Sequence, residues 1–218
     1  MSDALRGVEG EHAGGLAVSG VRVAFGDRRV LDGVEARVPK ACSVALVGPS
    51  GSGKTTLLAV IGGLLVASAG VVRYANSRVD SRDTAWVMQT SALLGARSAR
   101  SNVALGPLHK GLTRARSCAI ADAVLADLGM EEWARTPVRR LSGGERQRVA
   151  VARALAQSAP IVIADEPTAS LDAHSRDRVI DALLAVEDAG RLVVIATHDY
   201  RVAKRCSTVL ELVDGRVR

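Results

Sequence analysis

Short, almost wholly apolar runs recur along the chain, and each ends in glycine or in polar or charged residues. They are SVALVG at 43–48, AWVMQ at 85–89, PIVIADEP at 160–167 and RLVVIATHD at 191–199. Each run is too short for a helix, whereas TTLLAVIGGLL at 55–65 has helical spacing of its apolar residues. Apolar strands that alternate with helices predict a parallel sheet covered on both faces, with functional groups at the carboxyl ends of the strands.

Two further regions alternate between apolar and polar positions, as half-buried antiparallel strands do. LAVSGVRVAF at 16–25 and VEARV at 34–38 predict two strands of an edge sheet, joined through the polar turn GDRR. TVLELVDGRVR at 208–218 predicts a strand, an Asp-Gly turn and a short return strand. The sequence thus predicts an α/β fold in which an antiparallel edge subdomain lies beside a mainly parallel sheet.

Residues 90–140 differ from the rest because they are polar and have helical periodicity. A helix is predicted from Thr113 to Leu128, and Gly129 ends it. We expect a small helical lobe, at about 90–158, inserted in one domain that spans 16–218. Residues 1–15 are glycine-rich and lack periodicity, which predicts a flexible lead-in.

The composition is that of a globular protein of ordinary size. The chain has 218 residues, 48% of them hydrophobic and 24% charged, which suits one domain with a substantial core. No apolar run reaches the roughly 18 to 20 residues of a membrane span, and the first 15 residues lack the apolar centre of a signal peptide. Three widely spaced cysteines indicate neither a disulfide framework nor a zinc site. We expect a chain in the reducing cytoplasm.

The net charge of +6 comes from 29 basic and 23 acidic residues. Such a balance suits a nucleic-acid or anionic-membrane partner. The arginines are however scattered, with no lysine-rich block and no aromatic ladder, so we interpret them mainly as solvated surface. No nucleic-acid partner is expected.

A glycine-rich loop lies between the strand at 43–48 and the helix that follows it. The residues Gly48, Gly53, Lys54 and Thr55 match the phosphate-loop pattern GxxxxGK[ST] in full, in the required order of strand, loop and helix. Its backbone N–H groups can cradle phosphates, Lys54 can neutralise their charge, and the Thr55 hydroxyl can ligate Mg²⁺. The predicted phosphate-binding residues are Gly48, Pro49, Ser50, Gly51, Ser52, Gly53, Lys54, Thr55 and Thr56.

Polar residues at the ends of three other strands fit the same chemistry. Asp165 can complete the magnesium shell, and the adjacent Glu166 can polarise the attacking water as a general base. His198 ends the next strand and can bond the γ-phosphate or orient Glu166. Gln89 ends the strand at 85–89 and can contact Mg²⁺ or the water; its position is the only argument for it. The predicted catalytic residues are Glu166, His198 and Gln89, and the predicted metal ligands are Thr55, Gln89 and Asp165.

A second glycine-rich stretch, LSGGERQ at 141–147, precedes a predicted amphipathic helix. A helix N-terminus fronted by Ser142, Gly143 and Gly144 is itself an anion site. One nucleotide does not need two phosphate cradles from one chain. The residues therefore permit a role in closing over the nucleotide of a partner.

LSGGERQ resembles the signature motif of the ATP-binding cassette (ABC) ATPases, and the other motifs follow that family's order over about residues 16–218. In the family pattern Phe25 corresponds to the adenine-stacking aromatic, although Tyr is more usual there, and Gln89 to the Q-loop. Ser170, Leu171 and Asp172 correspond to the D-loop, and His198 to the switch histidine. The resemblance implies a RecA-like core and adds Phe25, Ser142, Gly143, Gly144, Glu145 and Asp172 to the nucleotide-binding residues.

The resemblance also implies how the chain acts. ABC ATPases pair head to tail and sandwich two ATP molecules with Mg²⁺, here with a second copy or a related ATPase. The chain would lie on the inner face of the cell membrane, held by an integral membrane permease. RTPVRR at 135–140 lacks the acidic, glycine-containing stretch of exporters whose ATPase is fused to membrane helices. In outline the chain is more similar to the separate ATPase subunits of MacB-like, lipoprotein-releasing or FtsX-type membrane proteins.

The sequence separates some alternative functions from that of a transport ATPase, but not all of them. An FtsE-like ATPase that drives a membrane-anchored regulator of an extracellular enzyme has the same motifs, so the sequence leaves that alternative open. DNA-repair relatives need a long coiled-coil insertion, and translation factors carry two cassettes. Assignment of the chain as a small-molecule kinase or a GTPase would leave the LSGGERQ motif unexplained. The NKxD motif that recognises guanine is also absent from the sequence.

Overall fold

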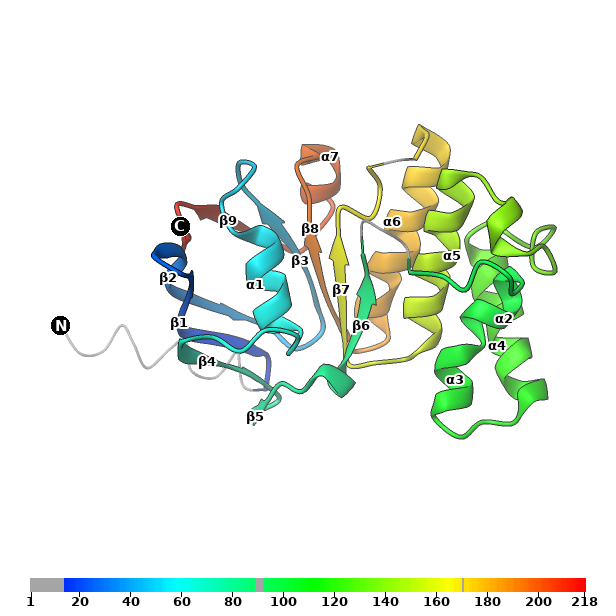
Figure 1. Cartoon of the computed structure of the whole chain (residues 1–218), viewed down its shortest axis with the longest axis horizontal. Helices are drawn as coiled ribbons and strands as arrows, with labels where there is room; N and C mark the ends of the chain where they lie inside the picture. Colours follow the sequence, from blue (N-terminus) through cyan, green and yellow to red (C-terminus); the bar gives the residue numbers. More distant parts are fainter. Residues whose placement is uncertain (1–13, 89–91, 170) are drawn as a thin grey trace.

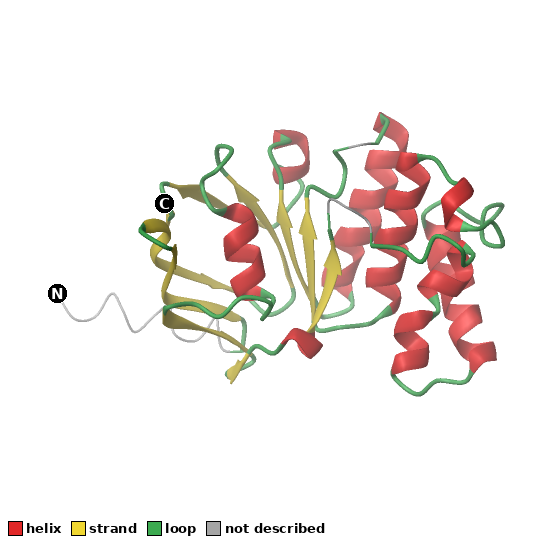
Figure 2. Cartoon of the chain, viewed as in Figure 1, coloured by secondary structure: helices red, strands yellow, loops and turns green. Residues whose placement is uncertain are grey.

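The computed structural model describes residues 14–88, 92–169 and 171–218. The roles expected of Gln89 and Ser170 therefore concern residues outside the described part of the chain. The lead-in expected at 1–15 lies almost entirely outside it as well. In Figures 1 and 2 two sheets and their helices occupy one side of the molecule, and a group of helices occupies the other.

A six-stranded sheet forms the centre, with the strand order β10-β9-β3-β8-β7-β6. Every described pair in it is parallel except β9 with β10. This confirms the predicted mainly parallel sheet and the terminal hairpin. Its strands are β3 (Cys42–Val47), β6 (Thr84–Val87), β7 (Ile161–Asp165), β8 (Leu192–Ala196), β9 (Thr208–Val213) and β10 (Arg216–Val217).

The central strands of this sheet, β3, β7 and β8, are buried on both faces, which explains why their sequences are almost continuously apolar. Ile163 and Val194 pack on the face covered by α1 (Lys54–Ile61) and the second sheet. Val162 and Ile195 pack on the opposite face, against α5 (Gly143–Ala156) and α6 (Ala173–Asp188). Successive residues of one strand therefore pack alternately into two hydrophobic cores, one on each face of the sheet.

The second sheet is antiparallel and has four strands, in the order β2-β1-β4-β5. Two of them, β1 (Leu16–Phe25) and β2 (Arg28–Val38), confirm the predicted pair, but the turn is Gly26–Asp27 and not the whole of GDRR. Phe25 pairs directly with Arg28, because Gly26 takes a positive φ of 57° and permits the tighter turn. The sequence reading missed β4 (Ala69–Tyr74) and β5 (Ser77–Arg78).

The helical group combines α5 with α2 (Ala99–Val103), α3 (Leu105–His109) and α4 (Arg114–Asp127). The predicted helix at 113–128 is confirmed: Thr113 caps the N-terminus of α4 and Gly129, at φ 62°, follows its end. Short elements complete the fold: the 3₁₀ turns η1 (Ser81–Asp83) and η2 (Val138–Arg140), and α7 (Tyr200–Ala203).

Two predicted elements end earlier than expected. The helix predicted over 55–65 ends at Ile61, because Gly62 is packed against the Trp86 ring and Gly63 takes a φ of 68°. The strand predicted at 85–89 is β6, which begins at Thr84 and ends at Val87. In both cases packing and glycine geometry set the end.

Candidate functional site

The glycine loop at 48–53 joins β3 to α1 in a conformation that needs glycine. Gly48, Gly51 and Gly53 have φ values of 148°, 79° and 105°. A Cβ atom on Gly48 would lie 2.1 Å from the Leu212 carbonyl oxygen, so no side chain fits there. Lys54 donates from Nζ to the carbonyl oxygens of Gly48 and Pro49, at 2.8 and 3.0 Å, which holds its ammonium group over the loop.

The loop leaves polar groups unpaired within the described part of the chain. The Ser52 hydroxyl is buried and has no hydrogen-bond partner there. At the N-terminus of α1, Gly53 supplies no side-chain cap, and no acidic residue lies in the first turn. Because a buried polar group without a partner is costly, this arrangement fits an anionic ligand that accepts from these donors.

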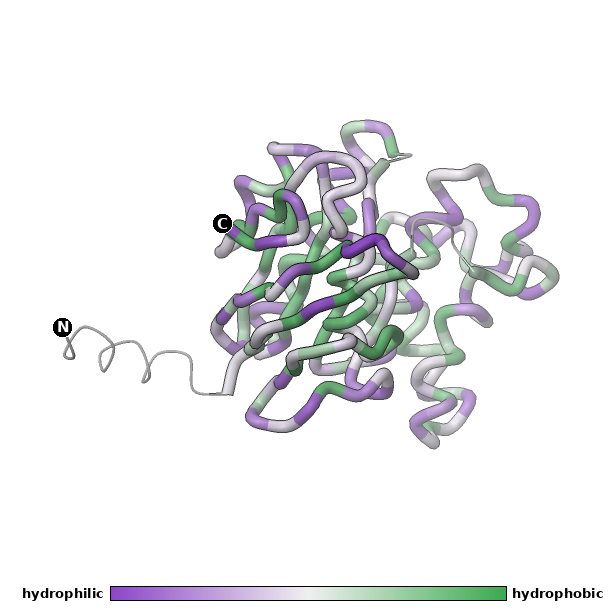
Figure 3. Tube along the Cα trace, turned by 60° about the vertical axis from the view of Figure 1, so that its left-hand side comes forward, coloured by the Kyte–Doolittle hydropathy of each residue, from purple (hydrophilic) through white to green (hydrophobic). Residues whose placement is uncertain are grey.

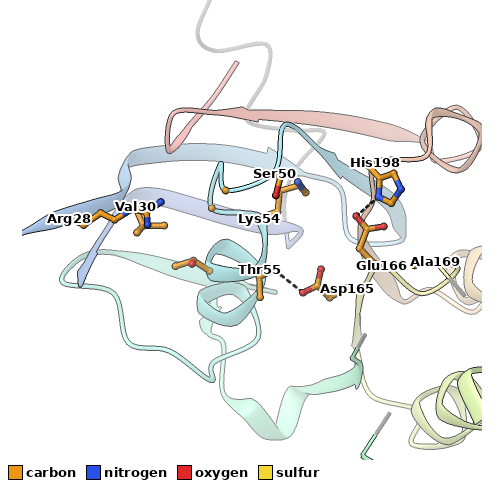
Figure 4. A pocket seen from close by; sticks show the side chains of 12 residues that line it. Arg28, Val30, Ser50, Lys54, Thr55, Asp165, Glu166, Ala169 and His198 are labelled. Carbon is orange, nitrogen blue, oxygen red and sulfur yellow. Dashed lines mark hydrogen bonds and ion pairs between the residues drawn. The ribbon is translucent and has the colours of Figure 1, made fainter. Parts of the chain in front are cut away.

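Thr55, in the first turn of α1, is hydrogen-bonded to Asp165 at the end of β7. The Thr55 hydroxyl donates to Asp165 Oδ2 at 2.8 Å (Figure 4). A hydroxyl and a carboxylate are oxygen donors of the type that Mg²⁺ takes, and magnesium sites at phosphates use only one or two carboxylates. These two residues therefore fit a magnesium ion, which would supply charge neutralisation to bound phosphates.

Glu166 and His198 meet at the carboxyl ends of neighbouring strands. β7 pairs with β8 up to Asp165 and Ala196, so the residues just beyond them lie side by side. His198 Nδ1 lies 2.8 Å from Glu166 Oε1, and the Glu166 side chain is only 17% exposed, whereas that of His198 is 74% exposed. The Glu166 backbone has a φ of 48°, and its N–H donates to the Ala196 carbonyl at 3.0 Å. The backbone conformation and this hydrogen bond fix the direction in which the Glu166 side chain leaves the main chain.

A cavity of about 480 Å³ joins these groups (Figure 4). The structure brings most of the predicted loop residues together with Asp165, Glu166 and His198 around it. It also adds Arg28 and Val30 of β2, which the sequence reading missed. No motif marks them, because they reach the cavity only through the way β2 passes the loop: the Val30 carbonyl would lie 3.1 Å from a Cβ on Gly53. The lining residues are Arg28, Val30, Ser50, Gly51, Gly53, Lys54, Thr55, Thr56, Asp165, Glu166, Ala169 and His198.

Phe25 is not among the residues that line this cavity. Its side chain is 55% exposed, and its hairpin partner Arg28 lines the cavity instead. An exposed ring at the rim is compatible with stacking on the base of a nucleotide whose phosphates lie in the loop. The role of Phe25 stays a prediction.

The second glycine-rich stretch has a different geometry. Ser142 caps α5: its hydroxyl accepts from the Glu145 N–H at 3.3 Å, and Glu145 Oε2 accepts from the Ser142 N–H at 2.7 Å. Ser142 and Gly143 are exposed, and neither lines the cavity. Asp172 likewise caps α6 by accepting from the Ser175 N–H at 3.0 Å, a bond that lowers the pKa of its carboxyl. Ser142, Gly143, Gly144, Glu145 and Asp172 thus lie outside the cavity that the phosphate loop lines.

The fold and this cavity together define a P-loop nucleoside triphosphatase. A strand, a glycine loop and a helix present donors for phosphates, and two acids and a histidine from the neighbouring strands face them. Comparison with known proteins then gives the family. The family model described as ABC transporter matches residues 31–169. The chain belongs to this family and is an ABC-type ATPase.

Relatives and solved structures agree with this assignment. The chain is 40% identical over 205 residues to the lipoprotein-releasing system ATP-binding protein LolD 1 of Caulobacter vibrioides, and the match covers 88% of this chain and 87% of that protein. It is 40% identical over 218 residues to the macrolide export ATP-binding/permease protein MacB 1 of Aeromonas hydrophila, with 93% of this chain covered. The chain spans about a third of the length of that export relative and of the pyoverdine export protein PvdT of Pseudomonas putida.

Among solved structures, the chain is similar to the ATP-binding cassette MJ0796, in a dimeric post-hydrolysis state bound to ADP and Pi. The TM-score is 0.85 at 30% identity, with 93% of this chain and 96% of that chain covered. This confirms the predicted fold class. Among the helices that the structure describes in residues 14–88, 92–169 and 171–218, none combines the length and the apolar character needed to cross a bilayer.

Proposed function

We propose that this chain powers substrate movement through a separate membrane permease, and that two copies close head to tail over two ATP molecules. The observation that supports pairing is the separation of the two glycine-rich stretches. Residues of the phosphate loop line a cavity together with Asp165, Glu166 and His198, whereas Ser142 and Gly143 are exposed outside it. An exposed helix N-terminus that its own nucleotide does not use is available to the nucleotide of a second chain.

Within each site, we assign the chemistry to residues of the cavity. Glu166 acts as the general base on the attacking water, and His198, 2.8 Å from it, positions its carboxylate. Lys54 binds the β- and γ-phosphates, and Thr55 and Asp165 hold Mg²⁺. Gln89 completes the magnesium shell in this proposal, from outside the described residues.

A second cavity supports the docking of a partner. It has a volume of about 970 Å³ and lies between η1 and β6 on one side and α3 and the end of α5 on the other. Trp86, Leu105 and Leu108 give it apolar walls, and Lys110 and Arg153 add cations. An amphipathic cytoplasmic helix of a permease suits such a groove. The relatives named above include both export and lipoprotein-release proteins, so the direction and the substrate stay outside the proposal.

The test is to purify the Glu166→Gln variant from its native membranes in the presence of ATP. The amide keeps the shape of the carboxylate but cannot accept the proton, so ATP turnover should be nearly lost and ATP-bound pairs should accumulate. Size-exclusion chromatography measures the pairing, and mass spectrometry identifies bound proteins. A multi-span membrane protein should co-purify.

Glu131→Gln is the matched control, since Glu131 is exposed on the helical side of the molecule. It should hydrolyse ATP like the unchanged chain. Turnover near normal in Glu166→Gln would refute the role of Glu166. Recovery of ribosomal or other soluble partners alone would refute the coupling to a permease.

A further inference from the structure

Three arginines lie in one line across the antiparallel sheet. Arg37 of β2 pairs with Ala17 of β1, Ala17 pairs with Arg73 of β4, and Arg73 pairs with Arg78 of β5. Residues directly opposite each other in neighbouring strands point to the same face. With strands about 4.8 Å apart, the three side chains form a row about 14 Å long, which we call the arginine row (Arg37, Arg73 and Arg78).

The row is on the solvent face of the sheet. The neighbours Val38, Val72 and Tyr74 are buried against the core, and all three arginines are exposed. Figure 3 brings this side of the molecule forward, and hydrophilic and hydrophobic residues alternate along its strands. Ala17, the residue between Arg37 and Arg73, has a short side chain and leaves room for both guanidinium groups at the surface.

Three other arginines, two on this sheet and one on β10 of the other, share an ion pair with one carboxylate, whereas those of the row have none. Arg22, Arg29 and Arg216 each form an ion pair with Asp32, at 3.6, 3.0 and 2.8 Å. Within residues 14–88, 92–169 and 171–218, no ion pair involves a member of the arginine row. Glu35, the acid nearest to the row along β2, accepts from the Gly20 N–H at 2.6 Å.

Arg73 and Arg78 are directly opposite each other, and like charges in that position destabilise a sheet. The fold therefore gains nothing from this pair. A planar arrangement of uncompensated guanidinium groups matches a planar array of phosphates, since each guanidinium can bind a phosphate through two parallel hydrogen bonds.

We propose that the arginine row is a docking surface for an anionic phospholipid bilayer, whose headgroup phosphates the three guanidinium groups bind. The choice of a bilayer rests on the proposed function, which brings the chain to a membrane. Ser81 and Arg82, which line the second cavity proposed above for the permease, lie three and four residues after Arg78 in the chain. RNA fits less well, because single-stranded nucleic acid is bound by exposed aromatic rings, and Tyr74, beside the row, is buried.

The test measures co-sedimentation of the purified full chain with two kinds of vesicle. One kind is phosphatidylcholine alone, and the other contains 30% phosphatidylglycerol. The chain should bind only the anionic vesicles and should be released by 0.5 M NaCl, because salt screens these contacts. Changing all three arginines of the row to Gln should weaken the apparent affinity by roughly a hundredfold, at about fivefold for each residue.

The matched control changes Arg114, Arg116 and Arg135 to Gln. These are exposed arginines on the helical side of the molecule, so the net charge falls equally. This control should bind anionic vesicles like the unchanged chain, and both triple variants should keep ATP hydrolysis in solution, which verifies their folding. The assay needs neither ATP nor a permease, so its result is independent of the proposed transport function.

Three outcomes would overturn the proposal. The first is an equal loss of vesicle binding in the control variant, which would make the net charge responsible. The second is absence of binding of the unchanged chain to the anionic vesicles. The third is binding of an RNA oligonucleotide, and not of vesicles, through the three arginines.

Discussion

Two glycine-rich segments precede helices in this chain, and they differ in how completely the protein satisfies its own polar groups. The loop at 48–53 leaves the Ser52 hydroxyl buried without a partner in the described residues, and neither a cap nor an acid is present at the start of α1. At the start of α5, Ser142 and Glu145 satisfy each other in a capping box, and Glu145 places a negative charge near the helix N-terminus.

This difference suggests that the two segments have different roles in binding phosphate. The first segment suits a phosphate, because the Ser52 hydroxyl has no partner in the described residues and no side chain caps the start of α1. At the second segment the capping box already uses two backbone N–H groups, and Ser142 faces solvent. We therefore propose that the first segment binds phosphate by itself, and that the second contributes only to a phosphate already held by a partner chain.

The largest expected effect comes from breaking each segment in separate chains and mixing them. Lys54→Ala removes the ammonium group that binds the phosphates, and Ser142→Arg blocks the start of α5. Each variant alone should lose roughly tenfold or more of its ATP hydrolysis, as expected when a hydrogen bond to a charged group is lost. Mixed in equal amounts they should recover about a quarter of normal activity, because half of the pairs then contain one intact composite site.

Phosphate release measures this recovery, and each variant alone at the same total protein concentration is the control. If mixing restored no ATP hydrolysis, the two segments would act on the nucleotide of the same chain, and the proposal that they act on different chains would be wrong. Recovery that rises with protein concentration would further indicate that pairing limits the rate.

A smaller effect is expected at the rim of the binding segment, at Phe25. Phe25→Ala removes the ring that we expect to stack on the base, and the affinity for ATP should fall roughly fivefold, the lower end for base stacking, because the ring is exposed. Phe25→Tyr keeps the aromatic face and should bind ATP normally. Equilibrium binding of a fluorescent ATP analogue measures the affinity of each variant. Equal affinities in the unchanged chain and both variants would show that the ring of Phe25 does not contribute to ATP binding.

The smallest effect is on stability and compares one serine from each segment. Ser142→Ala removes the cap of α5 and should lower the free energy of unfolding by about 1 kcal/mol. Ser50→Ala, at an exposed position of the phosphate loop, should change it by less than about 0.5 kcal/mol. Urea denaturation measures both, and a larger loss for Ser50 than for Ser142 would reverse the contrast between the segments.

Much of the fold was predictable because its central strands are buried on both faces. The runs containing Val44, Ile163 and Val194 are apolar at nearly every position. The polar residues that follow two of them place Asp165, Glu166 and His198 at one edge of the sheet. The 2.8 Å contact of Glu166 with His198 exists because β7 and β8 are neighbours in the sheet. The sequence placed each residue at the carboxyl end of a strand, but it did not give the order of the strands.

Other features depend on contacts that no local pattern records. The hairpin between β4 and β5 turns through Ala75 and Asn76, both with positive φ, and Ala at such a position gives no turn signal. Arg28 and Val30 line the cavity only because the antiparallel sheet folds over the phosphate loop. The capping box at Ser142 was readable from its spacing to Glu145, but its consequence for phosphate binding appears only beside the uncapped start of α1.

The backbone at Glu166 has one further consequence, for how this protein can change under selection. A left-handed conformation costs a non-glycine residue about 1 to 2 kcal/mol, and Glu166 adopts it at φ 48°. Glycine at this position would relieve that cost while removing the carboxylate. A screen for thermostable variants that ignores ATP hydrolysis would therefore favour loss of the very residue on which turnover is proposed to depend, so stability and catalysis pull in opposite directions at this one position.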